Sequence, residues 1–397
     1  MMKSFKFRIY PNKKQEVKLI QTLNTCRHTY NDALAERKQQ AKNIKIYKEY
    51  PIYQDFDIFH WGVNFDYINY YDQAKDLGKQ KTEYQKNVHS QVLQNVLKRV
   101  EKSFKNFFNG AGYPRFQGRN RYDSFTYPQK GFEITDDGKL KLSKIGEIKI
   151  IQHREIEGQI KTCTIRRDVD QWYVSFSCDV DTQHLEKTGM SVGIDVGLKS
   201  LVTLSNGEQI KPPKYLRESE KKLAKAQREL SRKQKGSSNR NKARIEVAKI
   251  HRHINNQRKD FNHKLSRTLV NTYDHIVFEK LQIQNMVKNH HLAKSILDAS
   301  WNQLIQFSTY KAEGAGRMVE LVNPQNTSKT CSVCGHIQVM PLSQRIYNCP
   351  GCGNVMDRDH NAANVIKSRA VGITVQACRG DHNSDLMKQE APLLVEG

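Results

Sequence analysis

Three acidic residues of the chain could together hold metal ions. Asp195 ends the short apolar run Val192–Asp195, and Glu279 ends a second such run, Ile276–Glu279. Runs of this kind are typical of buried strands, where an acid needs a functional reason. Asp359 lies in the sequence Asp-Arg-Asp-His-Asn-Ala-Ala. If the three acids converge, they form the oxygen-rich site that Mg²⁺ prefers, and a metal pair there could act on both sides of a scissile phosphate. The sequence therefore predicts a nuclease.

Each acid also has an ordinary interpretation. Glu279 could be an ion-paired residue at a strand end, Asp195 a turn residue, and Asp359 the N-cap of a helix. Asp357 lies two residues before Asp359, and spacing alone does not choose between them as the metal ligand. The joint occurrence of these acids with the cysteine motif described next favours the metal site.

Four cysteines form two Cys-x-x-Cys pairs. Cys331-Ser-Val-Cys334 and Cys349-Pro-Gly-Cys352 are separated by 14 residues and flanked by glycines. This spacing is slightly shorter than usual, but the doubled pattern is typical of a zinc ribbon with four thiolate ligands. Because four protein ligands leave no open coordination position, we expect one structural Zn²⁺ and not a catalytic one. A pair of disulfides is the weaker alternative.

The net charge of the chain indicates the class of partner that it binds. The 397 residues carry a formal net charge of +24, which favours a polyanion bound in a salt-dependent way. The segment Lys214–Arg267 holds 18 Lys and Arg against 5 Asp and Glu. Apolar residues at helical spacing on both sides of Gly236-Ser237-Ser238-Asn239 predict an antiparallel helical hairpin there. We expect nucleic acid as the partner, although such a hairpin could also be only a solvated charged surface. The candidate contacts are Lys98, Lys102, Lys105, Arg115, Arg119, Arg121, Lys221, Lys225, Arg228, Arg232 and Arg252.

In the first half of the chain, alternating apolar residues predict an antiparallel β domain, a meander or small barrel. Its strands are predicted at Phe5–Tyr10, Gly131–Thr135, Lys139–Leu142, Glu147–Ile151, Ile160–Arg167 and Trp172–Asp179. Two helices, Lys14–Gln39 and Asn87–Phe108, would be inserted in it, the second with Lys98, Arg99, Lys102 and Lys105 facing outward. Residues 41–80 are rich in aromatic residues without a clear period, and these rings could stack on bases or fill a core.

The second half of the chain has a different pattern. We predict a strand at Val192–Asp195, a hairpin of Leu201–Leu204 with Gln209-Ile210, the basic helical hairpin, and a strand ending at Glu279. A helix at about Ile296–Ala312, a strand at Met318–Val322, the cysteine module and a helix from Asp359 or His360 follow. This order of strands and helices predicts an RNase H-like fold in which the zinc ribbon precedes the third acid.

Two membrane-related classes are disfavoured. The N-terminal sequence Met-Met-Lys-Ser-Phe-Lys-Phe-Arg lacks the apolar stretch of a signal peptide, and no window reaches the roughly 18 apolar residues of a membrane span. We therefore expect a cytoplasmic protein without a membrane partner.

The motifs resemble those of the TnpB family, OrfB-type proteins of insertion sequences related to type V CRISPR nucleases. The matching segments are Gly193-Ile-Asp-Val-Gly-Leu-Lys199, Glu279-Lys-Leu, Thr327-Ser-Lys-Thr-Cys-Ser-Val-Cys-Gly335, Asp357-Arg-Asp-His-Asn-Ala-Ala-Asn-Val-Ile366, Phe104-Lys-Asn-Phe-Phe108 and Tyr113-Pro-Arg-Phe116. With Arg8-Ile-Tyr-Pro-Asn12 at the N-terminus, the resemblance extends from Phe5 to about Ala370.

The resemblance implies an α+β multidomain fold. A wedge β-barrel domain would comprise residues 1–13 and 110–190, with a helical recognition lobe, residues 14–109, inserted in it. A RuvC nuclease domain, which is RNase H-like, would comprise residues 191–326 and 356–378 and carry the helical hairpin. The zinc ribbon would occupy residues 327–355, and residues 379–397 would be a mobile tail.

The same resemblance implies an RNA-guided, Mg²⁺-dependent DNA endonuclease encoded by an insertion sequence. Its guide would be a non-coding RNA from the transposon end, with one protein per RNA, and it would cut double-stranded DNA next to a short transposon-associated motif. Asp195, Glu279 and Asp359 would hold two Mg²⁺ per active site. Three alternatives stay open: an RNA-guided regulator that binds DNA without cutting, a transposase, and a compact type V CRISPR effector.

Overall fold

A computed structural model of the chain describes residues 1–49, 67–119, 121–182, 184–341 and 343–371. The chain divides into two compact units, Met1–Asp181 and Thr182–Gly397. The boundary lies a few residues before the predicted one at residues 190 and 191. None of the helices within the described residues has the length and apolar character needed to cross a membrane.

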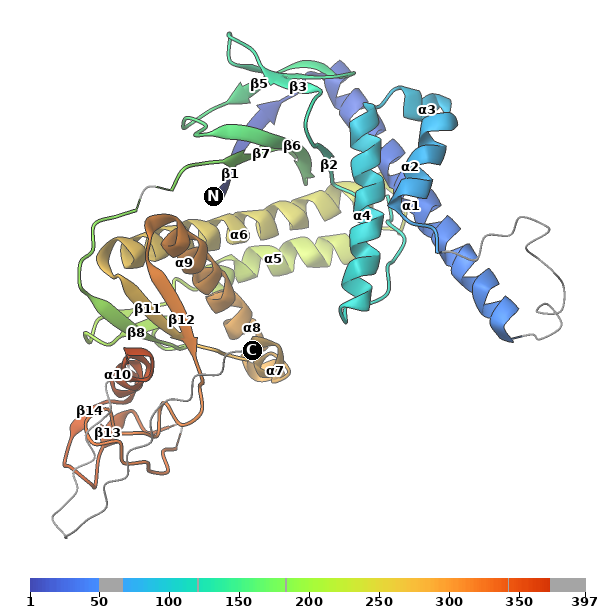
Figure 1. The fold of residues 1–397 in the computed structure, drawn as a ribbon. Helices are drawn as coiled ribbons and strands as arrows, with labels where there is room; N and C mark the ends of the chain where they lie inside the picture. The colour runs from blue at the N-terminus through green and yellow to red at the C-terminus, as the bar shows by residue number, and fades with distance from the viewer. Residues whose placement is uncertain (50–66, 120, 183, 342, 372–397) are drawn as a thin grey trace, which may run out of the picture. The chain divides into compact units, whose positions relative to one another are not determined.

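The first unit contains a seven-stranded antiparallel sheet (Figure 1). The strands follow the order β2-β6-β7-β1-β5-β4-β3, so β2 and β3 are the edges, and the predicted closure into a barrel is not seen among the described residues. In β1, Phe5, Phe7 and Ile9 alternate into the core. The bounds are β1 Met2–Tyr10, β2 Ser124–Tyr127, β3 Phe132–Ile134, β4 Lys139–Leu142, β5 Gly146–Ile151, β6 Gln159–Asp168 and β7 Gln171–Asp179.

Strand β2 was not among the strands predicted from the sequence. The structure pairs Phe125 with Ile165 and Tyr127 with Cys163 of β6, and burial of both aromatic rings accounts for the strand. Pairing with a distant strand is a long-range contact that so short a segment does not signal by itself.

Within the described residues, four helices lie between β1 and β2, namely α1 Lys13–Glu49, α2 Tyr70–Lys79, α3 Glu83–Lys86 and α4 Ser90–Phe108. The prediction of two helices missed α2 and α3. Arg99 of α4 was expected to face outward, but it is directed at β2, where it donates to the Ser124 carbonyl at 2.7 Å and to Thr126 Oγ1 at 3.0 Å. Of the aromatic stretch, residues 50–66 lie outside the described residues, whereas Tyr67 and Tyr71 are exposed.

The second unit contains a five-stranded sheet in the order β10-β9-β8-β11-β12. Strands β8, β11 and β12 are parallel, and the hairpin of β9 and β10 pairs antiparallel with β8. The predicted strands of this unit are confirmed, with bounds β8 Ser191–Val196, β9 Val202–Leu204, β10 Gln209–Ile210, β11 His275–Glu279 and β12 Met318–Val322.

Helices α5 Tyr215–Arg232 and α6 Ser238–Thr272 form the predicted basic hairpin (Figure 1). Arg240 stabilises the turn between α5 and α6 by donating hydrogen bonds to the carbonyls of Leu230 and Lys233 at 2.9 and 2.8 Å. The four remaining helices are α7 Ile283–Met286, α8 His290–Ala299, α9 Trp301–Ala315 and α10 Arg358–Val371.

The single helix predicted at Ile296–Ala312 is wrong, because the chain breaks at Ser300 between α8 and α9. Ser300 adopts a left-handed conformation with φ of 51°, and its Oγ accepts a hydrogen bond from Asn262 of α6 at 3.0 Å. The apolar periodicity continues through this break, so the sequence pattern did not reveal it.

The two faces of the second sheet carry different residues. Val192, Ile194, Ile276 and Phe278 share a core with residues of α6 and α9. Side chains alternate along a strand, so Gly193, Asp195, Val277 and Glu279 point to the opposite face. There Val277 packs with Ile366 of α10. Asp195 and Glu279 therefore belong to the face that α10 covers.

Gly193 allows α10 to approach the sheet closely. A Cβ placed on Gly193 would lie 2.1 Å from the Ala363 carbonyl oxygen and 2.5 Å from the Lys367 backbone nitrogen. These are backbone atoms of α10, which cannot rotate away as a flexible side chain could. The close contact of β8 and α10 therefore requires glycine at this position.

We predict that Gly193→Ala destabilises the second unit by about 3 kcal/mol, because α10 must move away from the sheet. Urea-induced unfolding followed by circular dichroism measures this loss. Gly78→Ala is the matched control, since a Cβ at Gly78 in α2 meets no atom within 4 Å and should stabilise the helix by about 0.5 kcal/mol. Equal stability of the Gly193 variant and the wild type would contradict the prediction.

Candidate active site and cysteine cluster

Asp195 and Glu279 lie at the same end of two neighbouring parallel strands. The register pairs His275 with Ser191 and Phe278 with Ile194, so the next residues along each strand are Glu279 and Asp195. Both carboxylates follow apolar residues that anchor the strands in the core. The sheet therefore brings together two acids that are separated by 84 residues in sequence.

Asp359 reaches this end of the sheet from α10. Ala363 and Lys367 of α10 contact Gly193, and Asp359 lies one helical turn before Ala363 on the same side of the helix. Gly193 lies two residues before Asp195 and shares its sheet face. The helix is thus placed so that its first turn points along β8 toward Asp195.

The electrostatics of Asp195 show that the three carboxylates interact. Burial raises the pKa of Asp195 well above its ordinary value, and the nearby negative charges of Glu279 and Asp359 raise it further. Arg358 opposes this rise in pKa. Two of the three predicted acids thus act directly on the third.

Glu279 is held by a neutral hydrogen-bond donor. The residue is only 7% exposed, and burial raises the pKa of its carboxyl. The Thr327 hydroxyl donates to Oε1 of Glu279, which lowers the pKa in part, as does the charge of Arg369. Thr327 was quoted as part of a family motif, but its contact with the acid was not predicted, because it depends on how a loop folds back on β11.

Asp357, the alternative to Asp359, has a different role in the structure. Its Oδ1 accepts hydrogen bonds from the backbone nitrogens of Asp359 and His360 at 3.0 and 3.1 Å, which makes Asp357 the N-cap of α10. Asp359 itself contacts Arg358 at 3.3 Å and Arg345 at 4.0 Å. The capping role considered for Asp359 therefore belongs to Asp357.

The four predicted cysteines converge in a small module with strands β13 Ile346–Asn348 and β14 Val355–Asp357. Their sulfur atoms all lie within 4.8 Å of one another, with Cys331 and Cys352 at 3.7 Å and Cys334 and Cys349 at 3.5 Å. Disulfide sulfurs would be about 2.05 Å apart, whereas four thiolates around a tetrahedral Zn²⁺ lie about 3.8 Å apart. The arrangement therefore fits a zinc-binding site and contradicts the disulfide alternative.

Among the described residues, these cysteines are the one set of three or more potential ligands packed within 4.8 Å.

Asn361 connects the cysteine module to α10. It is fully buried, its Nδ2 donates to the Thr330 carbonyl at 2.7 Å, and its Oδ1 accepts from the Ser332 backbone nitrogen at 2.9 Å. Sequence reasoning did not single out Asn361. An amide inside the apolar run that follows Asp359 was the available signal, since a buried amide must find partners.

Known protein families and individual proteins are similar to most of the chain. Family models match residues 175–290 (a probable transposase), 301–366 (a Cas12f1-like TNB domain) and 1–45 (a helix-turn-helix domain), the last of which covers β1 and most of α1. A putative RNA-guided DNA endonuclease of Streptomyces pristinaespiralis is 36% identical over 388 residues, which cover 95% of this chain and 90% of that protein.

The chain belongs to the TnpB family.

Further TnpB-family relatives include the putative RNA-guided DNA endonuclease InsQ of Escherichia coli (strain K12), 31% identical over 395 residues that cover 95% of this chain and 94% of that protein. A TnpB-like protein of Acanthamoeba polyphaga mimivirus is 33% identical over 229 residues, or 52% of this chain and 43% of that protein. A solved structure of a mini-RNA-guided endonuclease, CRISPR-Cas_phi3, aligns with 96% of this chain and 94% of its own, at a TM-score of 0.45 and 10% identity.

Most of the basic residues predicted to contact nucleic acid in this TnpB-family chain are exposed. Lys98, Lys102 and Lys105 lie along the exposed side of α4, and the Lys98 ammonium lies 5.4 Å from the ring centre of Tyr70. Arg115, Arg119 and Arg121 are exposed in the loop after α4, and Lys221, Lys225, Arg228 and Arg232 are exposed on α5. Arg252 of α6 is half-buried.

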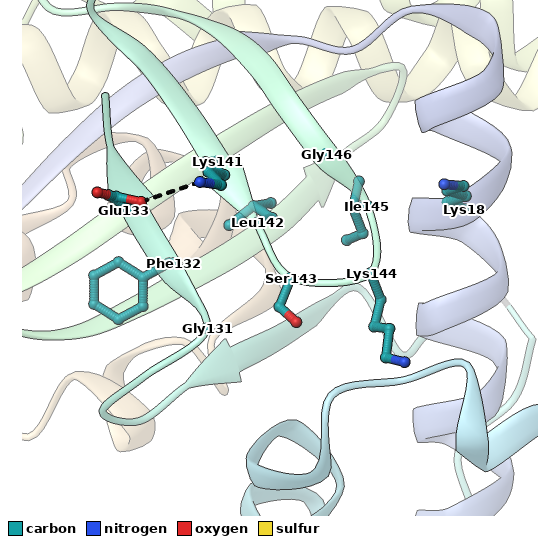
Figure 2. Close-up of a pocket in the computed structure, with 10 residues that line it drawn as sticks. All are labelled: Lys18, Gly131, Phe132, Glu133, Lys141, Leu142, Ser143, Lys144, Ile145 and Gly146. Carbon is teal, nitrogen blue, oxygen red and sulfur yellow. Dashed lines mark hydrogen bonds and ion pairs between the residues drawn. The ribbon is translucent and has the colours of Figure 1, made fainter. Parts of the chain in front are cut away.

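A pocket of about 570 Å³ in the first unit is also basic (Figure 2). Lys18 of α1 and Lys144 of the turn before β5 line it, together with Phe132 and the ion pair of Lys141 with Glu133 at 3.5 Å. Its lining contains exposed lysines and one partly buried ring. The pocket adds positive surface to the first unit but includes none of the three predicted ligand acids.

We predict that Asn361→Ala loosens the cysteine module from α10, because the Thr330 carbonyl and the Ser332 amide lose their partner, at a cost of about 2 kcal/mol. Limited proteolysis should cut the module faster, and urea-induced unfolding should show the lower stability. Asn364→Ala is the matched control, since the Asn364 side chain lies on the same helix without a hydrogen bond to the described residues. Similar behaviour of the two variants would contradict the prediction.

Proposed function

We propose that this chain is an RNA-guided DNA endonuclease in which Asp195, Glu279 and Asp359 are the ligands of two Mg²⁺ ions. One observation carries the proposal: Asp195 and Glu279 end neighbouring strands, Asp359 lies in the first turn of the helix that covers this face, and the charges of Glu279 and Asp359 raise the pKa of Asp195. The names of the relatives in Streptomyces pristinaespiralis and Escherichia coli support the activity. The strand order β10-β9-β8-β11-β12 supports an RNase H-like, RuvC-type domain.

The donor set fits this metal. Mg²⁺ prefers oxygen ligands and is usually bound by a few carboxylates together with water and phosphate oxygens. When bound, the two ions would supply an activated water and stabilise the charge of the leaving oxygen. In this scheme Asp195, Glu279 and Asp359 would together hold the two ions.

The protein groups around the acids would orient them. Thr327 fixes one oxygen of Glu279 by a hydrogen bond. Asp357 caps α10 and thereby fixes the first turn, which carries Asp359. Arg358 offsets part of the negative charge, since it lowers the pKa of Asp195 and contacts Asp359. Each group positions a carboxylate or opposes the rise in pKa of Asp195 or Glu279.

Guide RNA and double-stranded target DNA are the proposed partners, in keeping with the net charge of +24 and the exposed basic residues on α4, α5 and the loop after α4. The guide would supply sequence specificity by base pairing, and the protein would read the backbone and a short flanking motif. The source of the guide at a transposon end and one protein per RNA belong to the same proposal.

We predict that Asp195→Asn abolishes guide-matched cutting of duplex DNA in Mg²⁺ while RNA binding stays intact, because the variant keeps the shape of the residue but lacks its charge. The assay uses protein purified with its co-expressed flanking RNA, and gel electrophoresis measures cutting. Asp359→Asn should behave in the same way. Asp357→Asn is the matched control and should retain cutting, since asparagine caps helices as well as aspartate does.

The outcomes of this assay separate the candidates. Guide-matched binding by the wild type without cutting would indicate a regulator, and joined strands in place of free ends would indicate a transposase. Loss of activity in Asp357→Asn with retention in Asp359→Asn would exchange the roles assigned to these acids. A compact type V CRISPR effector would give the same result as the proposed enzyme, so genome context must distinguish the two.

We also propose one structural Zn²⁺ bound by Cys331, Cys334, Cys349 and Cys352. We predict about one zinc per purified protein by elemental analysis, and loss of that zinc in Cys349→Ser with local unfolding of the module. Cys178→Ser is the control, because Cys178 is buried in the core of the first unit and lies outside the cluster. Unchanged zinc content in Cys349→Ser would contradict the ligand assignment.

A further inference from the structure

A polar pocket of about 470 Å³ lies in the second unit where the chain leaves β12. Asn323, Gln325 and Asn326 line it from the loop, Arg369 from the last turn of α10, and Ile337 from the cysteine module. The loop begins directly after Val322, the last residue of β12. Val322 pairs with Glu279, the last residue of β11, and the two strands are parallel neighbours. The pocket therefore opens at the end of the sheet that carries the acids.

Arg369 is held at this pocket by the protein itself. Its side chain is exposed, and its Nη1 donates to the Asn323 carbonyl at 2.6 Å. Nε and Nη2 have no hydrogen-bond acceptor among the described residues. The guanidinium also lies near enough to Glu279 to lower the pKa of that carboxyl. A positive charge with unused donors is thus placed beside one of the proposed metal ligands.

The other polar groups of the pocket also favour an anion. Both oxygens of Asn323 are already used, since its carbonyl accepts from Arg369 and its Oδ1 accepts from the Gln325 backbone nitrogen at 3.0 Å. Its remaining polar atom is the donor Nδ2. The lining residues include no acid. A guanidinium fork with nearby amides is the usual protein environment of a backbone phosphate.

We propose that this pocket binds the phosphate that neighbours the scissile one on the DNA strand being cut, with Arg369 as its main contact. The inference rests on the proposed function, because it concerns the substrate of that same site. Binding one phosphate in the pocket would fix which phosphodiester bond lies over the acids. Arg369 therefore sets the register of the strand, a role distinct from holding metal.

The test combines a protein variant with a change in the DNA. Methylphosphonate, which lacks the phosphate charge, replaces single phosphates in turn around the cut position of the guide-matched duplex. The purified complex of full-length protein and RNA cuts each DNA, and the rate and the cut positions are measured. Wild type, Arg369→Gln and the control Lys329→Gln are compared, since Lys329 is an exposed residue of the same loop region that does not line the pocket.

We expect one methylphosphonate position to slow the wild type about tenfold, as for loss of one charged hydrogen bond. Arg369→Gln should cut unmodified DNA about tenfold more slowly, with more scattered cut positions, and should show no further loss at that methylphosphonate position. Lys329→Gln should retain the full sensitivity of the wild type. This pattern would assign the phosphate to Arg369.

The inference would be overturned if the losses in cutting rate caused by Arg369→Gln and by methylphosphonate multiply at every position. Arg369 would then act only by stabilising the loop to which it is hydrogen-bonded. Asn326→Asp provides a second test that leaves Arg369 and its bond to Asn323 in place. The added carboxylate should slow cutting of unmodified DNA, and the methylphosphonate at the identified position should relieve that effect. Absence of relief would also count against the pocket. A wild type that does not cut at all would instead refute the proposed function, and the inference with it.

Discussion

The geometry of the acidic site depends on the direct contact between the backbones of α10 and β8 at Gly193. A side chain at this position would overlap the Ala363 carbonyl and push the helix away from the sheet. Asp359 lies one turn before Ala363, whereas Asp195 lies two residues after Gly193, so the separation of the two carboxylates follows from this contact. If the helix moves, all three acids can still be present in the chain without lying close together.

The cysteine module is linked to the same site by two polar residues. The chain between β12 and α10 starts and ends at the acidic end of the sheet, and the module occupies this connection. Thr327, before the first cysteine, bonds to Glu279, while Asn361, just after Asp359, bonds to Thr330 and Ser332. The cysteine module therefore connects Glu279, through Thr327, with the helix that carries Asp359, through Asn361.

The sequence was sufficient for features that depend on local pattern. Short apolar runs ending in an acid predicted β8 and β11, and the doubled Cys-x-x-Cys motif predicted the cysteine cluster. Both patterns depend only on residues that are close together in the sequence. The break at Ser300, the pairing of β2 and the contacts of Thr327, Asn361 and Arg369 were missed. Each depends on a partner far away in the chain, such as Asn262 for Ser300 or Asn323 for Arg369.

The residues that surround the acids must reconcile two opposing requirements, the burial of the carboxyls and their ionisation for metal binding. Burial and mutual repulsion favour protonation of Asp195, yet a protonated carboxyl would be a poor metal ligand. A lysine or arginine paired tightly with each acid would keep it ionised but would compete with a cation for its oxygens. Thr327 instead orients Glu279 without neutralising it. At Asp359, Arg358 donates to Oδ1 from both Nε and Nη2, at 3.4 and 3.3 Å, whereas Arg345 lies 4.0 Å from Oδ2. Nearby positive charge therefore offsets part of the rise in pKa, from Arg358 at Asp195 and from Arg369 at Glu279, while Thr327 leaves the charge of Glu279 available to a metal.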